Sequence, residues 1–268
     1  MTIKTIIHPV TGQPFHLGRL RPSIEALGRP RLRLGKYFTP DLPPPPAGPL
    51  GRYEAIPDVI KQLYGNNDYG DCTIAGKFHL IGTFTGLANP PPMIFTDQQA
   101  VADYMRLTGG TDDGLDEITV LEDWRSGTGP ISSAHEIAGF ASVDATNQQH
   151  VQFAVWAFLN GYLGLELPDA YISPMPSKSG FVWDVAGDPN PDSGHCVVVV
   201  DFTPQGLIIL TWGMWGILTW KAAAKYLSNA GQGEFHVIWT EESIIKANLQ
   251  TPSGFNFAQL SADANLLQ

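Results

Sequence analysis

The sequence predicts an α+β protein, because a mostly helical first half precedes a strand-rich second half. Apolar residues recur at helical spacing up to about residue 160, and short apolar runs of strand length dominate after it. Only 16% of the 268 residues are charged, and 28 glycines and 22 prolines interrupt regular structure. The 43% of hydrophobic residues suffice for one main core. We therefore expect a loop-rich α+β enzyme with one main domain and extensions.

Residues 1–50 form the first predicted unit, a basic arm. Their segments HPVTGQPF, GRPR and LPPPPAGPL are rich in proline and glycine, which disfavour helices. We predict an extended arm that ends in a stiff polyproline linker. The arm has seven basic and two acidic residues, a net charge of +5 against −10 for the whole chain, so the remainder carries −15.

This charge asymmetry indicates what the arm 1–50 binds. A basic arm is expected to dock on the acidic body of its own chain, or on an acidic protein partner or assembly neighbour. Nucleic acid is not the expected partner, because no aromatic residues interleave with the arginines and no nucleic-acid-binding motif accompanies them.

Residues 51–240 are predicted to form the main domain, and its first part is helical. The segment PDVIKQLYG predicts a short helix, and Ile74, Phe78 and Ile81 recur at helical spacing after the polar segment GNNDYGDC. Cys72 therefore stands at or near a helix N-terminus. Further helices are expected over Asp97–Leu107, with Thr96 as the N-cap, over Thr119–Trp124 and over Gln148–Leu159.

The second part of the main domain is predicted to contain strands. Residues 162–167 alternate at period two, and residues 195–202 and 206–212 are continuous apolar runs typical of buried strands. A helix over 220–227 and a strand over 236–239 are expected to follow. Residues 241–268 are predicted to be a C-terminal extension packed through Phe255, Phe257 and Leu260.

Composition also excludes several classes of protein. The two cysteines are too few for a disulfide framework or a zinc site, and TDDGLDE does not match the spacing of a calcium loop. We therefore expect no metal or cofactor. The N-terminal residues MTIKTIIHPVTGQPF lack the apolar core of a signal peptide, and no apolar run could span a bilayer. A cytoplasmic protein with no membrane partner is the expectation.

Cys72 is the candidate nucleophile. A cysteine nucleophile reacts as a thiolate, which the unpaired N–H groups and the dipole of a helix N-terminus favour. The alternative is a buried structural cysteine, but the polar, glycine-rich residues before Cys72 argue for exposure. Asp71, beside the thiol, works against a low pKa.

His195 is the candidate general base. Of the seven histidines, it alone begins a strongly apolar strand directly after a polar loop, GDPNPDSG. Alternation along that strand places Cys196 on the opposite face, so Cys196 is predicted to be a core residue.

These segments are similar to those of the papain-like cysteine peptidases, of the papain and calpain type. The resemblance rests on the residues around Cys72, including the triplet GDC, on those around His195, and on TWGMWG, and it spans roughly residues 52–230. It implies the papain-like fold, with a helical subdomain that carries the nucleophile helix and an antiparallel β-barrel-like subdomain that carries the histidine.

The resemblance also implies two supporting residues. The family has a glutamine six residues before the nucleophile as oxyanion donor, and Asn66 occupies that position here. The family's asparagine that orients the histidine corresponds to Thr211, directly ahead of Trp212. These two replacements leave the Cys–His pair intact but weaken the groups that assist it. The loss of one oxyanion donor alone costs about 100- to 1000-fold in rate.

Two functions from different classes follow. The first is a cysteine hydrolase of peptide or amide bonds, in which Cys72 forms a thioester, His195 transfers the proton, Asn66 holds the oxyanion and Thr211 orients His195. The second is a weak or inactive papain-like fold that serves a bacteriophage particle or another assembly, docked through its arm and possible in a virion. An inhibitory pro-segment is less favoured, because the arm lacks long charged helices. An acyltransferase use of the pair stays open.

Overall fold

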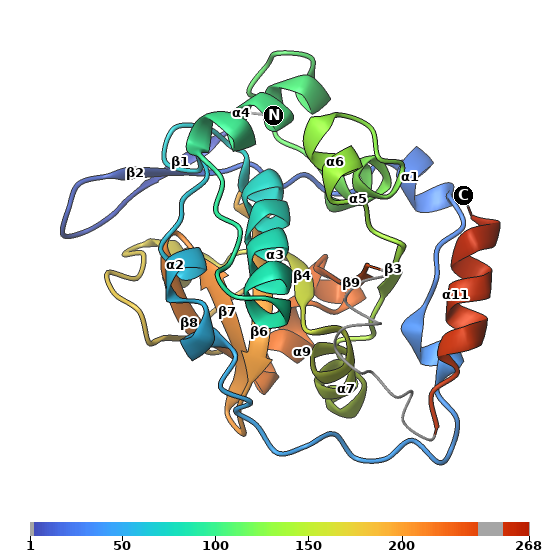
Figure 1. Cartoon of the computed structure of the whole chain (residues 1–268). Helices are drawn as coiled ribbons and strands as arrows, with labels where there is room; N and C mark the ends of the chain where they lie inside the picture. Colours follow the sequence, from blue (N-terminus) through green and yellow to red (C-terminus); the bar gives the residue numbers. More distant parts are fainter. Residues whose placement is uncertain (1–2, 241–253, 268) are drawn as a thin grey trace.

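A seven-stranded sheet between two layers of helices forms the centre of the protein, in a computed structural model that describes residues 3–240 and 254–267 (Figure 1). The strand order is β3-β9-β4-β6-β7-β8-β5, and all neighbours are antiparallel except β5 and β8. The strands are β3 (Gly139–Ser142), β4 (Gly161–Glu166), β5 (Phe181–Trp183), β6 (Gly194–Phe202), β7 (Gly206–Thr211), β8 (Met214–Thr219) and β9 (Glu234–Trp239).

The helices that precede the sheet gather around α3 (Figure 1). Of its 17 residues, 14 are buried, as expected of a helix that is apolar on nearly every side. The predicted cap of α4 is confirmed, because Thr96 and Gln99 form a capping box. This layer comprises η2 (Tyr53–Ala55), α2 (Pro57–Ile60), α3 (Cys72–Ala88), α4 (Asp97–Thr108), α5 (Glu117–Arg125) and α6 (Pro130–Ala134).

The two faces of β6 pack against different layers. Cys196 and Val198 belong to the apolar cluster around α3, whereas Val197 and Val199 belong to the cluster on the other face. Cys196 is therefore a core residue, as its alternation predicted. The remaining helices of the main domain are α7 (Gln148–Phe158), α8 (Asp169–Ile172), α9 (Trp220–Tyr226) and η3 (Asn229–Gly231).

The arm 1–50 is more structured than the prediction of an extended arm. Its described residues form a hairpin that buries Phe15 and Leu17, because these apolar side chains alternate along a strand that packs on the main core. Proline and glycine still dominate from Pro43 to Leu50, where neither helix nor strand occurs. The arm elements are β1 (Lys4–Ile7), β2 (Pro14–Leu17), α1 (Ile24–Gly28) and η1 (Leu34–Tyr37).

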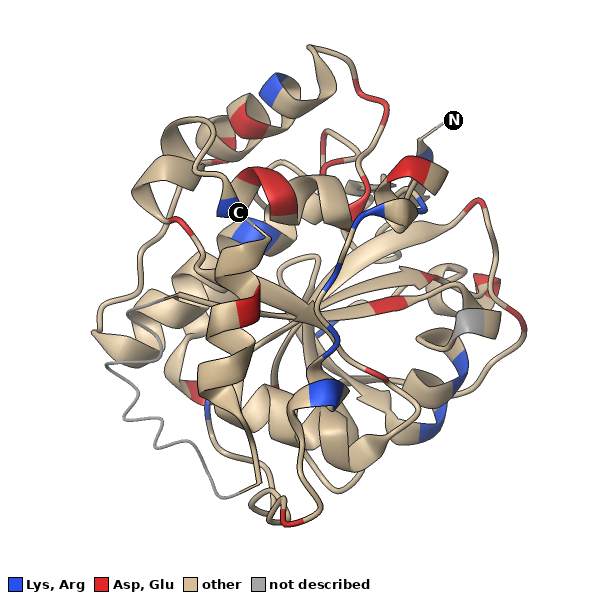
Figure 2. Ribbon diagram, turned by 90° about the vertical axis from the view of Figure 1, so that its right-hand side faces the viewer, with Lys and Arg blue, Asp and Glu red and all other residues tan. Residues whose placement is uncertain are grey.

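The basic side chains of the arm meet acidic side chains of the body. Among the described residues, four of the arm's seven basic side chains form such ion pairs, and charges of both signs are interspersed on the face shown in Figure 2. The pairs are Lys4–Asp169, Arg19–Glu234, Arg21–Glu166 and Arg29–Glu122. The arm is thus held by its own chain, in line with the charge asymmetry of the sequence.

The C-terminal extension packs as far as it is described. Phe255 and Leu260 are buried in the cluster beside α7, and α11 (Phe257–Leu266) follows them along the chain. The first part of the predicted extension, residues 241–253, lies outside the described residues. Within the described part of the chain, no helix is both long enough and apolar enough to cross a membrane.

Candidate active site

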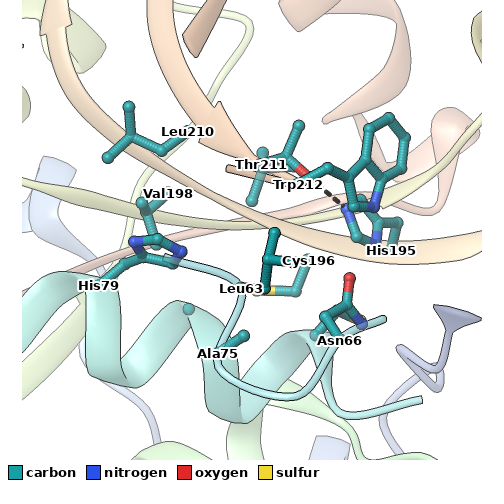
Figure 3. A pocket seen from close by; sticks show the side chains of 13 residues that line it. Leu63, Asn66, Ala75, His79, His195, Cys196, Val198, Leu210, Thr211 and Trp212 are labelled. Carbon is teal, nitrogen blue, oxygen red and sulfur yellow. Dashed lines mark hydrogen bonds between the residues drawn. The ribbon is translucent and has the colours of Figure 1, made fainter. Parts of the chain in front are cut away.

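The four residues predicted for the site line one cavity between α3 and the strands β6 and β7. Cys72, His195, Thr211 and Asn66 all contribute to its wall, and Figure 3 shows the last three of them. Its volume is about 20 Å³, roughly the room that one water molecule needs. The chain therefore brings the predicted residues together but leaves little room for a substrate in this state.

Cys72 is the first residue of α3 and is 2% exposed, in contrast to the exposure expected from its polar neighbours. Burial raises the pKa of its thiol to about 12, although the backbone N–H groups of Gly18 and Cys196 point at the sulfur and favour the thiolate. The charge of Asp71 works in the same direction as burial, as anticipated from the sequence. The thiol is therefore neutral at physiological pH.

His195 is held in place by its neighbours on β7. Its Nε2 lies 2.7 Å from the Thr211 hydroxyl oxygen, and its ring stacks on Trp212 with centroids 4.7 Å apart (Figure 3). The Nδ1 atom has no hydrogen-bond partner among the described residues. Burial lowers the pKa of His195 to about 3, so the imidazole is neutral. With Nε2–H donated to Thr211, Nδ1 is the nitrogen left to accept a proton.

Asn66 is engaged with the arm. Its side-chain Nδ2 donates to the carbonyl of His16 at 2.8 Å, and its backbone carbonyl accepts from the His16 N–H at 3.0 Å. The amide that the resemblance assigns to an oxyanion thus bonds an arm carbonyl oxygen instead.

The arm passes between Leu115, just before α5, and Gly194, the first residue of β6, and covers Cys72; we call the space that it fills the groove. On one side Leu115 donates to the carbonyl of Gly18 at 3.0 Å and accepts from Leu20 at 3.0 Å. On the other side the Arg19 N–H donates to the carbonyl of Gly194, the residue before His195, at 3.1 Å. The arm backbone is therefore hydrogen-bonded to both walls of the groove, and this explains the burial of Cys72.

Glycines make this close approach possible. A Cβ added to Gly18 would lie 1.7 Å from the carbonyl oxygen of Gly70, and one added to Gly194 would lie 2.1 Å from the carbonyl oxygen of Arg19. Neither contact leaves room for any side chain. The groove therefore fits a peptide backbone whose residue over Cys72 is glycine.

An acidic cluster opens off the same groove. One ligand atom each of Glu117, Glu234 and His236 lies within 4.8 Å of the others, a set that could hold a metal ion. Arg19 belongs to this cluster, because its guanidinium pairs with Glu234 and lies close to Glu117. None of these residues was predicted for the site from the sequence. No local pattern could have identified them, because Arg19, Glu117 and Glu234 come together only in the folded chain.

Solved structures with the same architecture are papain-like cysteine proteases. Xylellain, a cysteine protease from Xylella fastidiosa, matches with a TM-score of 0.53 and 14% identity, over 79% of this chain and 98% of its own. Procathepsin L2 from the larval midgut of Tenebrio molitor matches with a TM-score of 0.59 and 11% identity, over 83% and 77%. No family model and no curated protein matches the sequence. The chain has the papain-like fold, which confirms the resemblance at the level of the fold.

The raised pKa of Cys72 predicts how the intact protein reacts with iodoacetamide. Because the pKa is about 12, the alkylation rate should still be rising tenfold per pH unit between pH 8 and 10. A free thiol would level off above its pKa of about 8.5. Peptide mass spectrometry after timed quenching distinguishes Cys72 from Cys196. A plateau for Cys72 near pH 9 would show that the arm does not shield the thiol.

Proposed function

We propose that the protein is a papain-like cysteine hydrolase of peptide or amide bonds whose groove is filled by its own arm. The observation that carries the proposal is the shared cavity, which is lined by a cysteine at a helix N-terminus and by a histidine with one nitrogen bonded to Thr211 and the other unpartnered. The fold of the cysteine proteases supports the same class of reaction.

In the proposed reaction, Cys72 loses its proton to Nδ1 of His195 and its sulfur attacks the carbonyl carbon of the scissile bond. The backbone N–H of Cys72 and the amide of Asn66 stabilise the oxyanion. His195 then gives the proton to the leaving amine, and a thioester remains on Cys72. Water, deprotonated by His195, attacks the thioester and releases the acid. Throughout, the Thr211 hydroxyl accepts from Nε2–H and fixes the ring.

The arm is bound as a blocking segment and not as a substrate. A scissile bond must present its carbonyl carbon to the sulfur, whereas the arm presents the N–H of Gly18. The carbonyl of His16 occupies the Asn66 amide, and the neighbouring carbonyls of Gly18 and Arg19 face the walls. The arm thus covers Cys72 through short backbone contacts, without the long charged helices of a propeptide.

Hydrolysis by a chain with a displaced arm tests the proposal. We expect full-length Gly18→Ala protein to cleave members of a degenerate peptide library, and Cys72→Ser in the same background to abolish cleavage. Gly28→Ala is the matched control, because a Cβ at Gly28 meets nothing within 4 Å and leaves the arm seated. The products are read by mass spectrometry. If Gly18→Ala exposes Cys72 and still yields no cleavage above the Cys72→Ser level, the hydrolase proposal is wrong.

That negative result would favour the second candidate, a catalytically silent papain-like fold that serves an assembly. One observation favours this candidate. Ile6, Phe15 and Leu17 of the arm are buried in the main core, so the arm is an integral part of the fold rather than a detachable segment. A role in a bacteriophage particle remains part of this second candidate only.

A further inference from the structure

The side chain of Arg19 is almost completely buried, although Arg19 belongs to the basic arm. Its side chain is 1% exposed, and its guanidinium forms an ion pair with Glu234 and donates to the carbonyl of Gln232 at 3.3 Å. Arginine is rarely buried to this degree without a specific set of partners. The pocket therefore supplies charge and hydrogen bonds that suit a guanidinium.

A second carboxyl group, that of Glu117, lies close to Arg19 in the same pocket. Glu117 is fully buried, and neither of its carboxylate oxygens has a hydrogen-bond partner among the described residues. Its nearest cationic neighbour is Arg19, whose charge Glu117 and Glu234 together stabilise against the cost of burial. A half-buried carboxylate that pairs with the guanidinium and a fully buried carboxyl group close to it form a site that suits a cationic side chain better than a neutral one.

The pocket adjoins the proposed nucleophile. Gly18, whose N–H points at the Cys72 sulfur, directly precedes Arg19 in the chain. The hydrogen bonds that seat Arg19 and Leu20 run from their backbone N–H groups to the carbonyls of Gly194 and Leu115. These bonds do not depend on side chains, so any peptide backbone could form them, and the pocket alone selects which side chain enters.

From these observations we propose that the Glu117–Glu234 pocket is the recognition pocket for an arginine side chain of a peptide substrate, which Arg19 occupies in the closed protein. The inference rests on the proposed hydrolase function and names its substrate class. The cluster could also take a metal ion, but a guanidinium is the group that the structure places there. One of its N–H groups donates to the Glu234 carboxylate and another donates to a backbone carbonyl oxygen. An arginine side chain of a peptide ligand can donate both hydrogen bonds, whereas a metal ion has no N–H group to donate.

Binding of an arm peptide tests the proposal without requiring catalysis. The receptor is the full-length Gly18→Ala, Cys72→Ala protein, and the ligand is a fluorescent peptide of residues 14–21. A second peptide carries citrulline, which has the shape of arginine without its charge, in place of Arg19 alone. Anisotropy should show at least roughly 30-fold weaker binding of the citrulline peptide, because it leaves the Glu234 carboxylate without its cationic partner. Affinities within twofold of each other would overturn the proposal.

A second measurement applies if the displaced arm reseats and both peptides fail to bind. In the full-length Arg19→Ala protein, millimolar ethylguanidinium should restore the slow hydrogen exchange of the Leu20 amide, which bonds Leu115, and neutral ethylurea should not. Equal effects of the two compounds would overturn the inference. Failure of the hydrolase proposal and failure of the arginine-pocket proposal can be told apart. If the protein binds the arginine peptide selectively but Gly18→Ala protein cleaves nothing, only the hydrolase function is overturned.

Discussion

Replacing Gly18 with alanine is expected to raise the alkylation rate of Cys72 at pH 8 by roughly 1000-fold. The new Cβ would lie 1.7 Å from the carbonyl oxygen of Gly70, a backbone atom that cannot move aside as a flexible side chain could. The arm must therefore leave the groove at this point. With a pKa of about 12, only about one Cys72 in ten thousand is a thiolate at pH 8. At the pKa of a free thiol, about 8.5, roughly a quarter would be.

The measurement is timed iodoacetamide labelling with peptide mass spectrometry, on the intact protein, Gly18→Ala and the control Gly28→Ala. Near-UV circular dichroism shows whether the main core is retained, and hydrogen exchange of the Arg19 and Leu20 amides shows whether the arm has left. A folded Gly18→Ala protein with free arm amides and an unchanged Cys72 rate would contradict the account, because the arm would not be what shields the thiol.

Lys77→Met is expected to lower the free energy of unfolding by about 3–5 kcal/mol. Lys77 lies fully buried in α3, where its Nζ is 2.8 Å from Asp103 Oδ2 and 2.8 Å from Ser132 Oγ. Asp123 lies 3.8 Å away, and Arg106 pairs with both carboxylates. Removal of the lysine leaves two nearly buried carboxylates with one cation, and methionine replaces the volume but not the charge.

Urea unfolding, followed by tryptophan fluorescence, measures this loss. The matched control is Lys61→Met, whose exposed pair with Asp58 contributes at most about 1 kcal/mol. A loss below about 1 kcal/mol for Lys77→Met would show that the buried network contributes no more than a surface pair.

The sequence predicted those parts of the fold that depend on local pattern. The spacing of Ile74, Phe78 and Ile81 identified α3, and Thr96 marked the start of α4 to the residue. The apolar run after His195 identified β6. In each case a strong local period agrees with the tertiary packing, so propensity and burial favour the same element.

The arrangement of the site depended on contacts that no local pattern reveals. Cys72, His195, Thr211 and Asn66 do line one cavity, while their roles in catalysis remain predictions. Arg19 meets Glu234, which lies 215 residues away in the sequence. A prediction of exposure for Cys72 failed because it considered only the flanking polar residues and not the arm that covers them.

The central claim is that Cys72 and His195 form a competent pair beneath the arm. The most direct test is the pH profile of Cys72 alkylation in Gly18→Ala protein, with and without His195→Gln. We predict an apparent pKa clearly below the 8.5 or so of a free thiol when His195 is present, because an imidazolium stabilises the thiolate, and a return to that value or above in His195→Gln. Identical profiles near pH 8.5 in both proteins would contradict the claim.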